Sequence, residues 1–298
     1  MKQVGGLAAK LEALQARARQ RAEADGEKRE EKPPAPPPNN VVQLPLWLDE
    51  VRAVPNSFLR SALFGVIRKG RRRFIKGEQI AAVDGIEVRY TGERLDQGDL
   101  DVWEALLHAA RDQNLGSQVR VTSYALLKLM GRADTGGNRQ TLHRRVTRLR
   151  AGAIEIKQGR YVYIGGLVDE AYKDEETQEW IIVLNPRLRA LYGPDQFTQI
   201  EWAVRHELDG QQLAQWLHGF YASHAKPFPI KIETLHKLCG SEAVLMSDFA
   251  KKLRKALDAV AEASAAKGAT FSYEISEGLV HVEKAGSAAQ QRHLARKR

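Results

Sequence analysis

The stretch NRQTLHRRVTRLR, residues 138–150, predicts a helix with two chemically different sides and decides how the rest of the chain is interpreted. On a helical wheel, the apolar residues Leu142, Val146 and Leu149 share one side. Opposite them lie Gln140, Thr141, Arg144, Thr147 and Arg148, flanked by Arg139, His143, Arg145 and Arg150. No acidic residue interrupts the stretch, so the predicted helix anchors in a core on one side and is cationic on the other.

A second stretch, from about Asp248 to Ala266, repeats this pattern. Its core side is formed by Phe249, Leu253, Ala256 and Val260, with Lys251 and Lys255 opposite and Arg254 beside them. In both helices the basic pair comes two and six residues after the first core residue. One cationic helix side is most simply a solvated surface, but two matched sides favour binding to DNA.

Each of these helices occupies the same place in a repeated order of helix, strand, helix, turn, helix and β-ribbon. The first copy runs through residues 102–110, 119–121, 123–131 and 138–150 to strands at 153–158, 160–166 and 179–185. The second runs through residues 213–221, 230–232, 234–240 and 248–266 to strands at 269–276 and 279–284. The order predicts an α+β fold with two tandem, pseudo-duplicated winged-helix domains. The alternative is two unrelated helix–strand stretches.

The chain divides into five predicted segments. Residues 1–40 form a disordered or helical arm with a Pro-rich linker, in which PPAPPP at 33–38 is a stiff spacer. A docking peptide at 41–49, a first winged-helix domain at 50–200, a second at 201–284 and a basic C-terminal tail at 285–298 follow.

Composition favours a polyanionic partner in a reducing compartment. The 298 residues include 46 Lys and Arg against 37 Asp and Glu, a net charge of +9. Lys and Arg that neutralise phosphates release condensed counterions, which drives binding to nucleic acid. The single Cys239 excludes an internal disulfide. Because the sequence has neither a membrane-length apolar run nor a signal core, we expect a cytoplasmic protein without a membrane partner.

We predict three groups of DNA-binding residues. Arginine can donate two hydrogen bonds to guanine and glutamine can pair with adenine, whereas lysine mostly brings charge to phosphate. The two helices contribute Arg139, Gln140, Thr141, Arg144, Arg145 and Arg148, and then Lys251, Lys252, Arg254 and Lys255. The first wing adds Lys157 and Arg160, and a basic loop at 68–76 adds Arg71, Arg72 and Arg73. That loop could grip phosphates or a single strand, or could simply be solvated.

A short peptide after the proline spacer, QLPLW at 43–47, is similar to the pentapeptide by which bacterial proteins dock on the polymerase sliding clamp. Its predicted clamp-binding residues are Gln43, Leu44, Leu46 and Trp47. The apolar side chains would enter a pocket, while the glutamine fixes the end by hydrogen bonds. The alternative is that the leucines and the tryptophan pack on their own domain.

Several short motifs occur in an order that resembles one protein family. The first half has Pro55-Asn56, Arg60-Ser61-Ala62-Leu63-Phe64, Tyr90-Thr91-Gly92 and Val102-Trp103. The second half has Ser223-His224, Pro227, Pro229, Lys231, Glu233-Thr234 and Leu238-Cys239-Gly240-Ser241. From about Gln43 to Val282 the chain resembles the TrfA family of plasmid replication initiators. At the docking peptide, Trp47 stands where such initiators more usually have phenylalanine.

The resemblance implies more than the residues alone. It implies tandem winged helices that bind direct repeats (iterons) in double-stranded origin DNA and help to open an A·T-rich region, with single-stranded A·T-rich DNA as a further partner. It implies recruitment of the sliding clamp, the replicative helicase and the host initiator. It also implies exchange between a DNA-binding monomer and a homodimer.

Two other functions compete with this interpretation. An enzyme is disfavoured because the sequence lacks the phosphate-binding loop, the G-x-S-x-G elbow and the H-E-x-x-H zinc motif. His218 and His224 are more simply structural, and no histidine forms a metal-spaced pair with Cys239, so we expect no catalytic residue, metal or cofactor. A winged-helix transcriptional repressor of a plasmid promoter is the alternative function.

Overall fold

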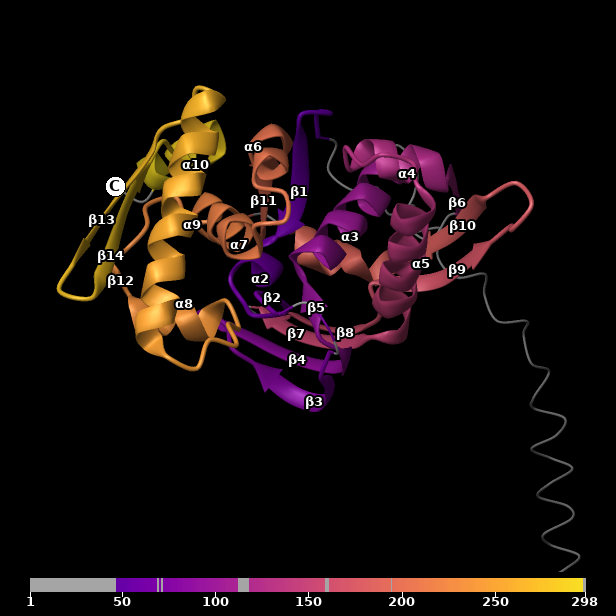
Figure 1. Ribbon diagram of the computed structural model, residues 1–298, viewed down its shortest axis with the longest axis horizontal. Coiled ribbons are helices and arrows are strands. Elements are labelled where there is room, and N and C mark those ends of the chain that lie inside the picture. Colours follow the sequence, from indigo (N-terminus) through magenta and orange to yellow (C-terminus); the bar gives the residue numbers. More distant parts are fainter. Residues whose placement is uncertain are drawn as a thin grey trace, which may run out of the picture. The chain divides into compact units, whose positions relative to one another are not determined.

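The computed structural model describes residues 47–68, 70, 72–111, 118–158, 161–193 and 195–296 (Figure 1). Every described residue belongs to one compact unit, Val42–Arg298. The predicted arm at 1–40 and the residues Gln43, Leu44 and Leu46 therefore lie outside the described residues. None of the helices within the described ranges is long and apolar enough to cross a membrane.

Three helices of the first half form where the sequence supplies both a cap and an apolar side. They are α3 (Gln97–Ala109), α4 (Ser123–Leu129) and α5 (Gly136–Ala151). In a capping box that starts α3, the side chains of Asp96 and Asp99 each accept a hydrogen bond from the other's backbone N–H at 2.9 Å. Thr122 and Thr135 cap α4 and α5 by accepting hydrogen bonds from first-turn amides. Accordingly α4 starts at the predicted residue and α5 two residues before it, whereas α3 starts five residues before the predicted 102 because Asp96 caps it.

The strands of the first half form two main sheets and two shorter pairs. One antiparallel sheet has the order β3 (Phe74–Ile80), β4 (Ile86–Glu93), β7 (Ala153–Gln158) and β8 (Tyr161–Gly165). The other has the order β6 (Gln118–Thr122), β10 (Glu179–Leu184) and β9 (Val168–Lys173). β1 (Val51–Pro55) pairs with β11 (Phe197–Glu201), and β2 (Phe64–Gly65) pairs with β5 (Leu95–Asp96). The short helices α2 (Asn56–Leu59) and η1 (Pro186–Tyr192) follow β1 and β10 in the sequence.

The second half contains the predicted helices and the predicted ribbon. Its helices are α6 (Trp202–Glu207), α7 (Gln212–Ala222), α8 (Ile232–Leu238), α9 (Met246–Ala266) and α10 (Ala288–Arg296). β12 (Ile230–Lys231) pairs with β14 (Leu279–Lys284), which pairs with β13 (Phe271–Ser276). The turn of this ribbon places Glu277 and Gly278 at positive φ, 51° and 76°, which suits the twist of the two strands. Part of the predicted C-terminal tail is thus the helix α10.

The buried apolar side chains gather in two clusters. One contains residues from Trp47 to Ile200, and the other contains residues from Val204 to Val282. We refer to residues 47–201 as the first module and to residues 202–296 as the second. The gap between the clusters lies at the predicted division at 200/201, but both modules belong to one compact unit, so the division into two domains stays a prediction.

The first module departs from the predicted order at its ribbon. The sequence places Lys157 and Arg160 in a wing formed by residues 153–166. In the structure, the ribbon that pairs with the strand between the helices is β9–β10, as β13–β14 is in the second module. β7 instead pairs with β4, and β8 pairs with β7. The predicted hairpin of residues 153–166 therefore forms, but its place as the wing is wrong, because alternating apolar and polar residues identify a strand without identifying the sheet that it joins.

A single residue, Gly152, joins α5 to β7. A Cβ atom built on Gly152 would lie 2.6 Å from the hydroxyl oxygen of Tyr90, so no side chain fits at this position. Tyr90 is buried on β4, and its hydroxyl donates a hydrogen bond to the Glu93 carbonyl at 2.8 Å. The C-terminal end of α5 is therefore packed directly against the four-stranded sheet.

A buried arginine connects the two modules. Arg205 on α6 is 1% exposed and donates a hydrogen bond to Oδ1 of Asp101 on α3 at 2.8 Å. Its guanidinium also donates to the side-chain and backbone oxygens of Gln97, each at 3.1 Å, and lies 3.6 Å from Oε2 of Glu104. Burial by itself would lower the pKa of Arg205, but the carboxylates of Asp101 and Glu104 outweigh burial and raise it. The interface thus contains a charge that is neutralised mainly by carboxylates of the other module.

Candidate nucleic-acid interface

The exposed side of α5 carries Gln140, Arg144 and Thr147. The Arg144 guanidinium donates to the Thr141 hydroxyl at 3.3 Å and has no acidic partner among the described residues. Arg139 is different, because Asp134 accepts two hydrogen bonds from it, at 2.6 and 2.7 Å. Arg144 is therefore both exposed and free of an ion pair within the described ranges, as is Arg150 near the C-terminal end of the helix.

Arg145 and Arg148 do not lie on the exposed side as the helical wheel predicts. Arg148 donates to Oδ1 of Asp99 at 2.7 Å and to Glu93 at 3.0 Å, and its side chain is 13% exposed. Arg145 donates to Asp96 at 2.6 Å and to Asp99 at 3.1 Å. The prediction that these side chains face DNA is corrected here: both bend toward the carboxylates that cap α3. A wheel gives the direction of a Cβ atom, but the long arginine stem follows a buried charge on a neighbouring element.

Arg72 completes this cluster. It pairs with Asp96 and with Asp99, the latter at 3.0 Å, so three arginines surround two carboxylates. Burial alone would raise the pKa of Asp96, but the charges of Arg145 and Arg72 lower that pKa to about 2. Arg72 was predicted to contact DNA from a basic loop, and in the structure it instead neutralises the cap of α3.

Most other arginines of the predicted basic loop either bind other residues of the chain or lie outside the described residues. Arg73 pairs with Glu78, although it stays exposed at the surface. Arg68 donates to the Glu242 carbonyl at 3.2 Å. Arg71 lies outside the described residues, as does Arg160 of the predicted first wing.

The basic side of α9 is fully exposed. Phe249, Leu253, Ala256, Leu257 and Val260 form its buried side. The predicted DNA-binding residues Lys251, Lys252, Arg254 and Lys255 are all exposed. None of the four has an ion pair with another residue that the structure describes, so this helix presents four uncompensated charges.

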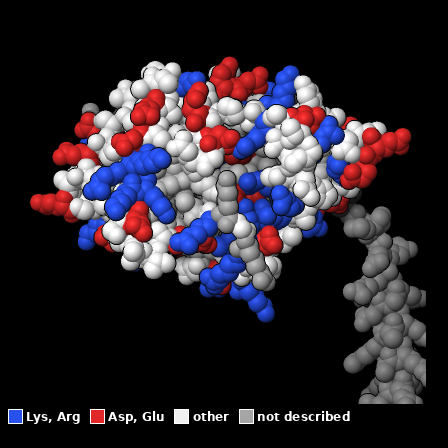
Figure 2. Space-filling view, in the orientation of Figure 1, with Lys and Arg blue, Asp and Glu red and all other residues white. Residues whose placement is uncertain are grey.

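The two basic helices lie on one face of the compact unit Val42–Arg298. Figure 2 shows a group of Lys and Arg side chains over α9 and another around α5, seen from the same side. A single extended anionic partner could therefore approach both helices.

The two β-ribbons carry acidic residues near their tips. The turn between β9 and β10 contains Asp174, Glu175 and Glu176, and the second ribbon has Glu274 and Glu277. Lys157, which the sequence assigns to the first wing, lies on β7 and pairs with Glu87 of β4 at 2.7 Å. The tips of the two ribbons therefore add negative charge, whereas the exposed sides of α5 and α9 are positive.

Trp47 of the predicted docking peptide is a core residue. Its ring is 6% exposed and belongs to the first hydrophobic cluster. Its indole N–H donates to Nδ1 of His108 at 3.2 Å, and burial lowers the pKa of His108 to about 4, which keeps that nitrogen an acceptor. Trp47 thus packs on its own domain, which was the alternative to clamp docking.

Sequence reasoning missed the residues that hold the modules together. Besides Arg205, Arg94 pairs with Glu242 at 2.8 Å and donates to the Gly240 carbonyl at the same distance. Arg205 lies in the short helix WAVRHE, and its place beside apolar residues was the one local sign that its side chain is buried. Its acidic partners are about a hundred residues earlier, and no local pattern identifies them.

The fold and this surface define a class of protein in which two α+β modules each present a basic helix on a common face. Domains 2 and 3 of RctB share the fold, with a TM-score of 0.55 at 12% identity, covering 78% of this chain and 99% of that structure. A second crystal structure of RctB domains 2–3 gives a TM-score of 0.50, covering 76% and 97%.

The sequence model described as TrfA protein matches residues 38–284, and the chain belongs to this family. The plasmid replication initiator protein TrfA from Escherichia coli is 25% identical over 249 residues, which cover 80% of this chain and 63% of that protein. RepFIB replication protein A from Salmonella typhi is 27% identical over 195 residues, covering 61% and 59%. The chain thus spans about three fifths of the length of these relatives.

Proposed function

We propose that this chain is a plasmid replication initiator that binds direct repeats in origin DNA through two winged-helix domains. The observation that carries the proposal is the pair of basic helices α5 and α9 on one face. Each helix has a buried apolar side that fixes its orientation and an exposed side that can enter a major groove about 12 Å wide. Membership of the TrfA family and the names of the relatives support the same function.

The two helices differ in what they offer to DNA. On α5, Arg144 and Gln140 are exposed and suited to hydrogen bonds with base edges. On α9, the exposed side chains are mostly lysines, which bring charge to phosphates. We assign sequence reading chiefly to Arg144 and Gln140, and sequence-independent affinity to Lys251, Lys252, Arg254 and Lys255. Arg145 and Arg148 have the supporting role of holding α5 on the cap of α3.

Gel-shift and footprinting titrations on an origin fragment with direct repeats test this assignment. Arg144→Ala should weaken specific binding by about 1–3 kcal/mol and relax the preference at the bases it reads. Lys251→Ala plus Lys255→Ala should weaken binding to all sequences. The slope of log K against log salt concentration should fall by about one for each lysine removed. Arg120→Ala, an exposed residue on β6 outside both helices, is the control. An unchanged site preference in Arg144→Ala would contradict base reading by α5.

Recruitment of host factors forms the second part of the proposal. As the family resemblance implies, the initiator would help to open an A·T-rich region, engage the replicative helicase, the host initiator and the sliding clamp, and exchange between monomer and homodimer. Clamp docking by the peptide at 43–47 would require Trp47 to leave its buried position. A clamp pull-down with Leu44→Ala plus Leu46→Ala should lose the clamp and keep duplex binding. Undiminished pull-down would rule out this peptide as the clamp site.

A transcriptional repressor would use the same two helices, so DNA binding does not separate the alternatives. The discriminating experiment supplies this protein alone to a host that carries a replicon with the direct repeats. An initiator sustains replication of the fragment, whereas a repressor only lowers expression from a reporter placed behind the repeats.

A further inference from the structure

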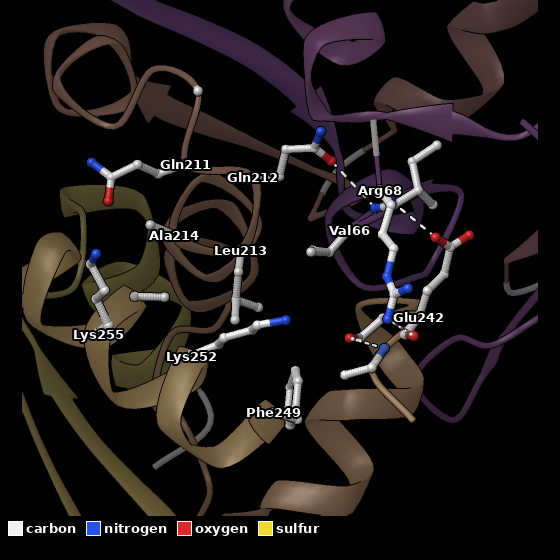
Figure 3. Close-up of a pocket in the computed structure, with 15 residues that line it drawn as sticks. Val66, Arg68, Gln211, Gln212, Leu213, Ala214, Glu242, Phe249, Lys252 and Lys255 are labelled. Atoms are coloured by element: carbon white, nitrogen blue, oxygen red, sulfur yellow. Dashed lines mark hydrogen bonds between the residues drawn. The ribbon is translucent and has the colours of Figure 1, made fainter. Parts of the chain in front are cut away.

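A cavity of about 300 Å³ opens beside α9, next to the place where Arg94 and Glu242 join the modules (Figure 3). Residues 66–68, the first turn of α7, the turn before α9 and the first half of α9 line it. Its apolar lining includes Val66, Leu213, Ala214, Phe249 and Ala256. The volume is at the lower end of cavities that hold ligands, which suits one large side chain rather than an extended molecule.

The opening of this cavity has a surplus of positive charge. In Figure 3, Lys252 and Lys255 extend from α9 on one side, and Arg68 and Glu242 lie on the other. Glu242 is already engaged, because its carboxylate accepts from the Arg68 backbone N–H at 3.0 Å and pairs with Arg94 at 2.8 Å. Neither lysine has an acidic partner in the part of the chain that the structure describes. The cavity therefore offers two free cations around an apolar floor.

Neither a duplex nor a purely apolar ligand matches both features. The phosphates of a duplex would satisfy the lysines but would bring no apolar group to fill the floor. A purely apolar side chain would fill the floor but leave the lysine charges without partners. A segment that combines carboxylates with one large apolar side chain complements the whole cavity, since a central apolar anchor with a charged rim is the usual arrangement of a peptide interface.

We propose that this cavity is a docking site for an acidic segment of another protein, with a large apolar side chain on the floor and carboxylates beside Lys252 and Lys255. The same two lysines belong to the basic side of α9. Peptide docking and duplex binding by α9 are therefore mutually exclusive, and a partner of this kind would release the second module from DNA. This competition rests on the proposed DNA binding, whereas docking itself does not.

The test uses the whole chain and a fluorescein-labelled synthetic peptide in which one phenylalanine is flanked on both sides by aspartates. Fluorescence anisotropy titrations give the peptide affinity. Lys252→Glu plus Lys255→Glu should weaken peptide binding by about tenfold or more. The matched control is Lys251→Glu plus Arg254→Glu, which makes the same charge change on exposed positions of the same helix that do not line the cavity. Its effect should stay below about threefold.

A second probe tests the apolar floor without altering the protein. A peptide with glycine in place of the phenylalanine keeps every charge and should bind about tenfold more weakly, because its anchor is lost. Equal affinity of the two peptides, or equal effects of the two double substitutions, would overturn the docking site and reduce the binding to general attraction by a basic helix.

Competition is measured separately by adding unlabelled duplex that carries the direct repeats. The duplex should displace the labelled peptide. Duplex that binds without displacing it would overturn the competition and leave docking intact. Duplex that does not bind at all would contradict the proposed function, and the peptide titrations would still decide docking on their own.

Discussion

Removing the buried arginine at the module interface should expose how strongly the two modules depend on one another. In Arg205→Ala, the carboxylate of Asp101 loses its hydrogen bond at 2.8 Å, and Glu104 and Gln97 lose a cationic neighbour. Breaking a buried pair by removing one partner leaves an uncompensated charge, which costs about 3–5 kcal/mol. That is a large fraction of the total of about 5–15 kcal/mol by which a protein is usually stable.

The effect should depend on pH in a direction that the structure specifies. Burial raises the pKa of Glu104 to about 7, so this carboxyl is mostly neutral at pH 5 and mostly ionised at pH 8 while Arg205 is present. At pH 5 the substitution leaves only Asp101 without its counter-charge. We therefore expect Arg205→Ala to cost less at pH 5 than at pH 8.

Urea unfolding at both pH values, followed by tryptophan fluorescence, measures the two costs. Arg120→Ala is the control, because its partner Glu179 lies at 3.3 Å on an exposed surface, where an ion pair contributes about 0–1 kcal/mol. A loss below about 1 kcal/mol for Arg205→Ala at pH 8, or a larger loss at pH 5, would refute the buried-charge reasoning.

Three further predictions concern single side chains. Arg148→Ala should lower the free energy of unfolding by about 2 kcal/mol because the buried Asp99 loses a charged donor. Arg144→Ala is the control and should change the free energy of unfolding by no more than about 0.5 kcal/mol. Equal urea midpoints for the two variants would contradict the buried contact of Arg148. Glu104 has a folded pKa of about 7 against an ordinary value of 4.5, so the folded state retains a proton that the unfolded state releases, and stability falls as pH rises through this window. Glu104→Gln cannot ionise and should flatten that fall; a pH profile identical to that of the unsubstituted protein would contradict the assignment. Trp47→Phe removes the donor to His108 and should cost about 1 kcal/mol in thermal unfolding, and an unchanged Tm would show that the hydrogen bond adds nothing to stability.

The helices could be predicted because their information is local. The α5 helix was expected at 138–150 and is observed at Gly136–Ala151, and α9 was expected to end at Ala266 and does so. Leu142 and Leu253 are buried, and Arg144 and Lys251 are exposed, as the apolar periodicity requires. Caps and periodicity act within one or two turns of a helix, so a single sequence contains them in full.

The features that could not be predicted depend on a distant partner. Arg148 and Arg144 differ by four residues on one helix, yet only Arg148 reaches the carboxylate of Asp99, some fifty positions earlier. The hairpin of β7 and β8 was recognised, but the pairing of β7 with β4 on its other edge depends on tertiary packing. Likewise, the sequence around Trp47 gives no local sign that its indole will be buried and donate a hydrogen bond to His108.

The one-residue joint at Gly152 has a consequence for how relatives of this protein can vary. Side chains of β7 alternate, so that Ile154 and Ile156 are buried while Glu155 and Lys157 are exposed. Inserting or deleting one amino acid at the joint would turn both isoleucines to water and both charges to the core, unless the helix itself shifted. Between residues 151 and 153, therefore, the chain length is fixed. The residue at 152 must also be glycine, because Tyr90 occupies the space of a side chain.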